Sequence, residues 1–234
     1  MNVFLAGATG VIGRRLSLML IADGHAVTGT TRSRAKEAKL RAGGVTPIIV
    51  DVFDGSALRD AVVRAKPEIV IHQLTDLAGP LDPGRREEML ARNARLRIEG
   101  TANLMQAAVS AGIRRVVAQS VAFLYAPGEG PRRESDPVEA SGVAVGARAL
   151  ERAVLEAPGI DGIVLRYGYF YGPDTWSDAP RMQPALHIDA AAHAALLAVT
   201  QGSGGIYNIA DDDGAVSIEK ARRDLGFDPG ARRA

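Results

Sequence analysis

The first sixteen residues constrain the fold more than any other stretch of the chain. Residues 3–6 form a short apolar run typical of a buried strand, which breaks into the sequence Gly7-Ala-Thr-Gly-Val-Ile-Gly13. An apolar period of three and four residues, typical of a helix, resumes at Leu16. A strand, a glycine turn and a helix in this order place free N–H groups and the positive end of a helix dipole over the end of a strand. The pattern therefore predicts an anion site, most simply for the pyrophosphate of a nucleotide.

Each glycine of this turn has its own expected role. Gly7 would permit the tight turn, Gly10 the close approach of phosphates, and Gly13 the close packing of helix on strand. Thr9, Val11 and Ile12 are predicted to bind the nucleotide together with these glycines. The alternative is a helix that is merely opened by glycines.

The end of the second predicted strand, residues 24–31, bears on the choice of cofactor. An acidic residue there would bind a ribose 2′-hydroxyl, as NAD requires, but the strand runs into Thr30-Thr31-Arg32-Ser33-Arg34. With no carboxylate to repel a 2′-phosphate, Arg32 could clamp one. The sequence therefore favours NADP(H) over NAD(H), the alternative being that Arg32 is a solvated loop residue.

The rest of the chain alternates strands and helices, which predicts right-handed βαβ units and a mostly parallel sheet. At the strand ends, Asp51 and Val52 are expected near the adenine, and Gln73, Leu74 and Thr75 at the cofactor crevice. His72 is expected to be a hydrogen-bonded core residue, and Ser56 to cap a helix. Further strands are expected at 47–51, 68–74, 116–120, 162–166 and 205–209, helices at 35–42, 85–111 (with a bend at Gly100), 143–156, 189–200 and 218–225, and loops at 77–84 and 126–137.

Composition excludes several classes of function. The 234 residues are 47% hydrophobic with a formal net charge of +1, so a large core is possible and no basic face indicates nucleic acid. There is no cysteine, and the four histidines lack metal-ligand spacing. The acidic turn 211–213 could hold a divalent cation, but a solvated turn is the stronger expectation, so no metal site is predicted. With no signal peptide or membrane span expected, we predict a cytoplasmic protein.

Over nearly its whole length the chain resembles the extended short-chain dehydrogenases/reductases, the NAD-dependent epimerase/dehydratase family. The resemblance rests on many motifs in the family's order, each weak alone. They are the glycine turn 7–13, Val50-Asp51-Val52, Ile71-His72, Gly100-Thr-Ala-Asn-Leu104, Leu165-Arg166-Tyr167, Tyr171-Gly-Pro173, His187-Ile188-Asp189 and Tyr207-Asn208-Ile209.

The resemblance implies a doubly wound α/β Rossmann fold, with an NAD(P)-binding domain at residues 1–173. Residues 174–234 would form a shortened C-terminal substrate lobe, interleaved with the end of the Rossmann fold. It further implies a small-molecule substrate with a carbonyl or hydroxyl group, sugar-like in some family members, and a homodimer formed through helices 85–111 and 143–156. The other cofactor-binding residues that we predict are Asn93, Gln119, Ser120, Tyr167 and Gly168.

The chain departs from the family where the chemistry lies. The family uses a Ser or Thr, a Tyr, and a Lys four residues after the Tyr, but here the Tyr and Lys positions fall on Val143 and Ala147. No lysine lies between Lys66 and Lys220, so a shifted alignment cannot restore one. Arg97 takes the place of a usual Asn, with Asn93 one turn away.

Another group must then supply the proton. Tyr125, with Ser120, is the predicted catalytic pair, and Arg148 and Tyr169 are weaker candidates. A packing role for Tyr125 is the alternative.

A second departure is the short connection 174–186, either a natural pruning or the result of stretches absent from the sequence. Two functions follow from these observations. The first is an NAD(P)-dependent oxidoreductase or epimerase-like enzyme without the Tyr–Lys pair, and the alternative is a catalytically silent NADP(H)-binding sensor or scaffold.

Overall fold

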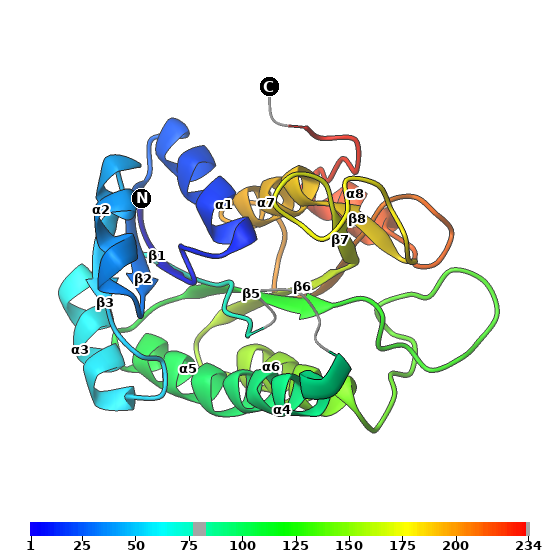
Figure 1. Ribbon diagram of the computed structural model, residues 1–234, viewed down its shortest axis with the longest axis horizontal. Helices are drawn as coiled ribbons and strands as arrows, with labels where there is room; N and C mark the ends of the chain where they lie inside the picture. The colour runs from blue at the N-terminus through cyan, green and yellow to red at the C-terminus, as the bar shows by residue number, and fades with distance from the viewer. Residues whose placement is uncertain (77–82, 233–234) are drawn as a thin grey trace.

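A seven-stranded parallel sheet with helices on both faces forms the molecule, in the order β3-β2-β1-β4-β5-β6-β9 (Figure 1). The computed structural model describes residues 1–76 and 83–232. The sheet strands are β1 (Asn2–Ala6), β2 (Ala26–Thr31), β3 (Thr46–Ile49), β4 (Ile69–His72), β5 (Arg115–Val121), β6 (Asp161–Tyr167) and β9 (Gly205–Ile209). This is the doubly wound Rossmann-type architecture that the sequence predicted.

The strand order reverses direction at β1, which pairs with β2 on one side and with β4 on the other. From β1 the chain continues to β2 and β3 at one edge of the sheet, and from β4 it continues toward β5, β6 and β9 at the other edge. The connections that leave the carboxyl ends of β1 and β4 therefore diverge. A ligand crevice is expected at such a switch point.

The helices divide between the two faces of the sheet. On one face lie α1 (Val11–Ala22), α2 (Glu37–Ala42), α7 (Ile188–Leu197) and α8 (Glu219–Leu225), and on the other α3 (Gly55–Ala65), α4 (Arg86–Arg95), α5 (Thr101–Ser110) and α6 (Val143–Leu155) (Figure 1). Strand residues alternate between these two cores, with Val3 and Leu5 packed on the α1 face and Phe4 and Ala6 on the α5 face. Burial on both faces explains why the strands read as nearly continuous apolar runs.

Residues after 173 complete the main sheet as well as adding to its edge. Strand β9 pairs with β6, and α7 packs beside α1. The short parallel pair β7 (Tyr169–Tyr171) and β8 (Ala185–His187) forms a separate two-stranded sheet. Each aspartate of turn 211–213 has its own partner: Asp211 binds the Tyr171 hydroxyl, Asp212 binds Arg222, and Asp213 accepts from the backbone of Ala185.

Two expectations about helices need revision. Ser56 does not cap α3, because the helix begins one residue earlier and the Asp54 carboxylate accepts a hydrogen bond from the N–H of Ala57 instead. The long helix expected at 85–111 is divided into a 3₁₀ turn η2 (Pro83–Arg85), α4, a π-helical turn η3 (Leu96–Gly100) and α5. The irregularity at Gly100 is thus a widened turn. Most of the loop expected at 77–84 lies outside the described residues.

A further short 3₁₀ turn, η1 (Arg34–Lys36), precedes α2. None of the helices within residues 1–76 and 83–232 combines the length and the apolar composition that crossing a membrane requires.

Candidate functional site

The glycine turn between β1 and α1 has the shape that the sequence predicted. Gly7 has a φ of +95°, and a Cβ there would lie 2.8 Å from the carbonyl oxygen of Gln73. A Cβ on Gly13 would lie only 2.1 Å from the Gly7 carbonyl oxygen. The tight turn at Gly7 and the close packing at Gly13 are confirmed, since neither position has room for a side chain.

Gly10 directly precedes α1, and no side chain in the described part of the chain caps the start of this helix. A Cβ there would meet one atom, the Gly7 carbonyl oxygen at 3.3 Å, so the residue is open on its outer side. The first turn of α1 also carries no acidic residue. Uncapped N–H groups beside an open glycine fit an anionic group such as a pyrophosphate.

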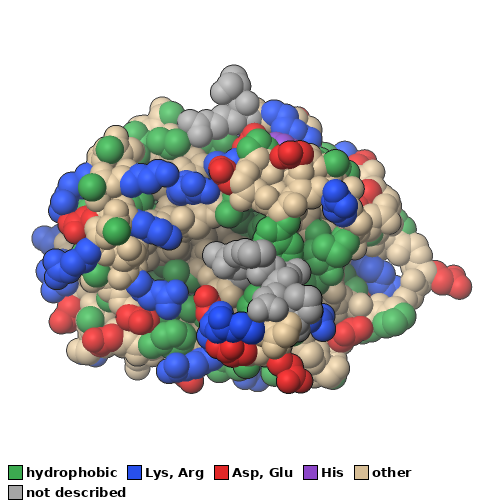
Figure 2. All heavy atoms as spheres, viewed as in Figure 1, with side chains coloured by type: hydrophobic (Ala, Val, Ile, Leu, Met, Phe, Trp, Pro, Cys, Tyr) green, Lys and Arg blue, Asp and Glu red, His purple; other side chains and the backbone are tan. Residues whose placement is uncertain are grey.

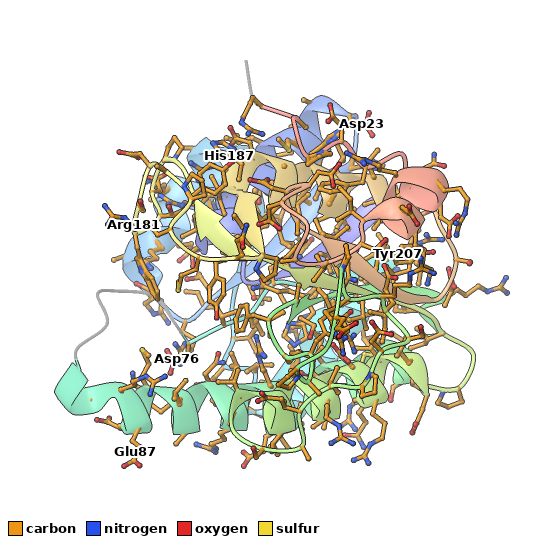
Figure 3. All side chains as sticks on the ribbon, turned by 90° about the vertical axis from the view of Figure 1, so that its right-hand side faces the viewer. Asp23, Asp76, Glu87, Arg181, His187 and Tyr207 are labelled. Carbon is orange, nitrogen blue, oxygen red and sulfur yellow. The ribbon has the colours of Figure 1, made fainter. Side chains whose placement is uncertain are left out.

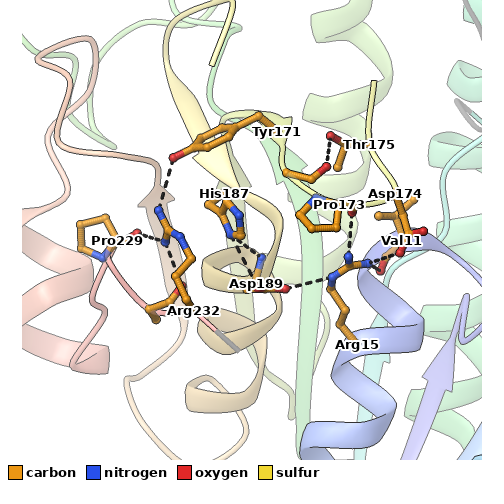
Figure 4. A network of polar contacts seen from close by, with 12 residues as sticks. Val11, Arg15, Tyr171, Pro173, Asp174, Thr175, His187, Asp189, Pro229 and Arg232 are labelled. Carbon is orange, nitrogen blue, oxygen red and sulfur yellow. Dashed lines mark hydrogen bonds and ion pairs between the residues drawn. The ribbon is translucent and has the colours of Figure 1, made fainter. Parts of the chain in front are cut away.

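The buried side chain of Arg15 connects the first turn of α1 to α7 and to the segment after β7 (Figure 4). Its guanidinium donates to Asp189 at 3.0 Å, to the Pro173 carbonyl at 2.7 Å and to the Val11 carbonyl at 3.3 Å, and pairs with Asp174 at 3.1 Å. The start of α7 and the segment after β7 are thereby fixed against the first turn of α1.

The end of β2 presents the groups expected to select the cofactor. Thr30 is buried and accepts a hydrogen bond from the Gly7 N–H at 3.1 Å, whereas Arg32 is exposed just beyond the strand. The Thr31 hydroxyl accepts from the N–H of Ser33, which shapes the turn. Figure 2 shows several Lys and Arg side chains on this side of the molecule. An exposed guanidinium at this point fits a 2′-phosphate.

A buried polar side chain, Gln73, lies at the carboxyl end of β4, where the cofactor crevice is expected. Gln73 is buried, its amide nitrogen donates weakly to the Tyr167 hydroxyl at 3.5 Å, and its Oε1 has no partner in the described structure. An unpaired buried acceptor at this edge fits a donor group of a bound ligand. Leu74 and Thr75 follow, both partly exposed.

His72 is the hydrogen-bonded core residue that was expected. Its Nδ1 accepts from the N–H of Leu74 at 3.2 Å, and its Nε2 lies 2.9 Å from the Thr101 hydroxyl on α5. Burial, reinforced by the charge of Arg97, lowers the pKa of His72 to about 4. A neutral imidazole that is bonded at both nitrogens is a structural element here.

Asp51 and Asn93 stabilise loops near the crevice. Asp51 is exposed and accepts from the N–H of Phe53, while the carbonyl of the buried Val52 accepts from the Asn103 amide at 2.9 Å. Asn93, on α4, accepts from the N–H of Asp76 at 3.1 Å, and Asp76 lies just above α4 (Figure 3). Asn93 therefore positions the chain that follows β4.

Strands β5 and β6 bring Ser120, Arg166 and Glu151 into one buried network. The Ser120 hydroxyl donates to Glu151 at 2.7 Å, and Arg166 donates to both oxygens of the same carboxylate at 2.8 and 2.7 Å. Arg166 also donates to the Tyr125 hydroxyl at 2.8 Å, which in turn donates to Asn208 at 2.7 Å. Arg166 and Asn208 were noted in the sequence only as parts of family motifs, and Glu151 was not predicted as a site residue, because a buried pairing between distant segments has no local signature.

This network occupies the two residues predicted to be catalytic. Ser120 is fully buried, and burial raises the pKa of Tyr125 despite the neighbouring Arg166. A general base at neutral pH needs a pKa near 7, so a Tyr in this setting is poorly suited to abstract a proton. The catalytic role of Ser120 and Tyr125 stays a prediction, and none of these contacts supports it.

The remaining predicted contacts lie at the same edge of the sheet. Gln119 and Ser120 are among the last residues of β5, and Tyr167 ends β6 fully buried, with its pKa raised by burial. A Cβ on Gly168 would lie 2.7 Å from the Pro184 carbonyl oxygen, so this glycine is required by packing. Candidate cofactor residues from β1, β4, β5 and β6 thus converge at one edge.

Arg97 is another buried cation that was not among the predicted site residues. Arg97, in η3, is 2% exposed, and its Nη1 has no hydrogen-bond partner in the described structure. Burial lowers the pKa of Arg97 to about 10, against the opposing effect of Glu151. The signal in the sequence was the replacement of a family Asn by Arg at this position.

Comparison with known proteins agrees with this architecture. The profile of a family described as the NAD dependent epimerase/dehydratase family matches residues 3–202. A 3-diazoavenalumate denitrifying reductase from a Streptomyces species is 38% identical over 94% of this chain and 79% of the relative. A 4-hydroxy-2-methyl-3-oxo-4-farnesyl-3,4-dihydroquinoline-1-oxide ketoreductase from Stigmatella aurantiaca is 26% identical over 90% of this chain and 68% of the relative.

Solved structures share the fold. The UDP-glucose 4-epimerase of Thermotoga maritima, crystallised with UDP-glucose, superposes with a TM-score of 0.83 at 17% identity, covering 99% of this chain and 94% of the epimerase. The Bordetella bronchiseptica enzyme WbmG, in complex with NAD and UDP, gives a TM-score of 0.80 at 17% identity, covering 100% of this chain and 90% of that enzyme.

Proposed function

Because the chain belongs to the NAD dependent epimerase/dehydratase family, we propose that it is an NADPH-dependent reductase of a small molecule. The observation that carries the proposal is the intact glycine turn, in which Gly7 and Gly13 have no room for a side chain. Arg32, exposed beyond β2, supports the preference for NADPH over NADH. The two relatives named as reductases support reduction over epimerisation.

Residues of several strands would hold the cofactor. The N–H groups of the first turn of α1 would bind the pyrophosphate, and Arg32 the 2′-phosphate. Asp51 and Val52 would lie near the adenine, and Gln73 and Tyr167 near the nicotinamide. When bound, a nicotinamide nucleotide supplies a hydride.

The chain has no Tyr–Lys pair at the family's positions to donate the proton that reduction of a carbonyl needs. Of the four lysines, Lys220 is committed to the Ile206 carbonyl at 2.7 Å, at the outer edge of the sheet, and the other three lie at positions 36, 39 and 66. Val143 and Ala147 supply no proton. The chain is therefore best suited to an acceptor that does not depend on a Tyr–Lys relay.

A diazo acid is one such acceptor, and the Streptomyces relative is named for a diazo compound. A diazonium group already carries a positive charge, so its terminal nitrogen can accept a hydride with no prior protonation. The new N–H proton can then move to carbon as the C–N bond breaks and N₂ leaves, so that hydrogen replaces the diazo group. A carbonyl substrate would instead need a proton from water or from another side chain.

Two measurements test this proposal. Fluorescence titration with NADPH and NADH should show saturable binding with NADPH preferred, and the absence of NADPH binding would refute it. NADPH oxidation should then be followed with an aryl diazonium carboxylic acid and with an aromatic aldehyde. Binding without turnover of either substrate would favour the alternative, a catalytically silent NADP(H)-binding sensor, which the missing Tyr–Lys pair also supports.

We further propose a homodimer formed through α5 and α6. The outer faces of α6 and of the π turn η3 that precedes α5 carry exposed apolar side chains, among them Ile98 at 43%, Val145 at 49% and Leu155 at 37% exposure. A shallow cavity of about 300 Å³ between the two helices is lined mainly by alanines and Ile98. Light scattering should give twice the monomer mass, and an Ala149→Glu variant should give the monomer mass.

A further inference from the structure

We propose that the cavity between α4 and α6 binds the carboxylate of an organic acid through Arg97. The cavity measures about 410 Å³, and its lining includes Asn93, Arg97, Gly142 and Val143. The inference rests on the proposed function in one respect, since the acid would be the substrate of the proposed reductase.

Arg97 and Asn93 are the buried polar residues among those that line this cavity, at 2% and 3% exposure, while Gly142 and Val143 of the same lining are exposed. A ligand that enters from solvent therefore meets a guanidinium in a largely desolvated setting. Charge-assisted hydrogen bonds are strongest in such a setting.

No anion within the described residues is committed to Arg97. Glu151 is the acidic group whose charge raises the pKa of Arg97, but both oxygens of Glu151 are bound by Arg166, and one also by Ser120. The Nη1 of Arg97 is buried and has no hydrogen-bond partner among residues 1–76 and 83–232. Proteins rarely leave a buried cation unpaired, because the desolvation cost is not recovered unless a partner arrives.

A glycine on α6 lets this helix approach Arg97 closely. Gly146 on α6 faces the α4–η3 helix, where an added Cβ would lie 3.2 Å from Ala94 Cα and 3.5 Å from Arg97 Cβ. Helices α4 and α6 run side by side below the sheet in Figures 1 and 3. Val143, a small side chain at the position of the family's Tyr, is part of the cavity lining.

The rest of the lining defines the acid that would fit. Leu90, Ala91 and Ala94 supply apolar surface, and Arg86 adds a second, exposed cation at the rim. An apolar or aromatic body with one terminal carboxylate matches this combination. Asn93 can direct its amide NH₂ to the same carboxylate, because its Oδ1 already accepts from Asp76.

Ligand-detected NMR on the full chain at pH 7 tests the site, with benzoate as the probe and benzamide as its neutral isostere. We expect saturable benzoate binding at least tenfold tighter than benzamide binding. Equal affinities, or no benzoate binding, would overturn the proposal without any variant.

Variants then locate the contact. Arg97→Met should weaken benzoate binding at least tenfold and leave benzamide binding unchanged, and Arg97→Lys should retain part of the affinity. Arg95→Met, which removes an exposed arginine of α4, should change neither. If Arg97→Met binds benzoate like the original chain, the site is elsewhere and the inference is wrong.

A parallel NADPH titration separates this inference from the proposed function. NADPH binding without benzoate selectivity would refute the carboxylate site alone. Benzoate selectivity without NADPH binding would refute the reductase proposal and leave the acid site standing.

Discussion

Glu151 on α6 and Arg166 on β6 form a two-point ion pair that is almost completely buried, with 6% and 4% of their side chains exposed. The pair ties the helix to the strand behind the candidate site, and it holds the Ser120 and Tyr125 hydroxyls in the same network. The positions nearest the expected chemistry are therefore engaged in a structural role.

Breaking this pair should be costly. We expect Glu151→Ala to lower the free energy of unfolding by about 3–5 kcal/mol, because Arg166 would be left buried without its counter-charge. Urea unfolding measures the change. The double variant Glu151→Leu/Arg166→Met should lose less than the single variant does, since it removes both charges. A loss below about 1 kcal/mol in Glu151→Ala would contradict a tight buried pair.

His72 should make stability depend on pH in the mildly acidic range. The pKa of His72 is 6.5 in the unfolded chain and about 4 in the folded chain. Between these two values the unfolded chain binds a proton at His72 that the folded chain does not bind. Stability should therefore be full above pH 6.5 and fall by about 3 kcal/mol between pH 6.5 and pH 4. Unfolding curves of His72→Gln should lack this part of the pH slope. His25→Gln is the matched control and should keep it.

Arg32 should decide the choice between the two nicotinamide cofactors. Arg32→Ala is expected to weaken NADPH binding at least tenfold, about 1.4 kcal/mol, and to leave NADH binding unchanged, because only NADPH carries a 2′-phosphate. Fluorescence titration of both cofactors checks this. Lys39→Ala, on the exposed face of α2, should bind both cofactors like the original chain. An equal loss for NADH would assign Arg32 a different role.

Gly13 should tolerate no side chain. Gly13→Ala would place a Cβ 2.1 Å from the Gly7 carbonyl oxygen and should cost about 1–3 kcal/mol of stability together with most of the cofactor affinity. Gly43→Ala is the matched control, since the nearest atom to its Cβ would be 3.5 Å away. If the two variants are equally stable in thermal unfolding, the close packing at Gly13 is not required.

Arg97 should reduce the stability of the free protein. Removing its charge in Arg97→Met is expected to raise the free energy of unfolding by about 1 kcal/mol, because an unpaired buried cation is then no longer desolvated. Arg115→Met should do the opposite, since its guanidinium binds Asp161 and the Ala198 carbonyl, each at 3.0 Å. Destabilisation by Arg97→Met would indicate an ordinary structural arginine.

The sheet and the glycine turn could be predicted because their signals are local. A buried strand followed by Gly7, Gly10 and Gly13 encodes its own geometry within one turn of chain. Helix boundaries were less accessible: Ser56 and Asp54 are both good capping residues, and the choice between them depends on where the chain leaves β3. No local pattern in the sequence marked the π turn at Leu96–Gly100, which packs against the distant helix α6.

The polar half of the site could not be read from the sequence for a related reason. Glu151, Arg166 and Asn208 meet only after α6, β6 and β9 have packed together. The lack of an ion-pair partner for Arg97 within the described residues also depends on tertiary structure, because Glu151 is paired with Arg166 instead. Cofactor-binding groups carried by one strand–turn–helix unit are thus predictable, and groups contributed by separate elements are not.

The π turn at Leu96–Gly100 sets the rotational phase between the two halves of a long helix. Asn93 lies before it and faces the cavity, whereas Thr101 follows it and meets His72 at 2.9 Å beneath the sheet. One residue in an α-helix corresponds to a rotation of about 100°. A single-residue deletion that restored a regular helix would turn Thr101 away from His72 or Asn93 away from the cavity, so the length of this segment is itself under constraint.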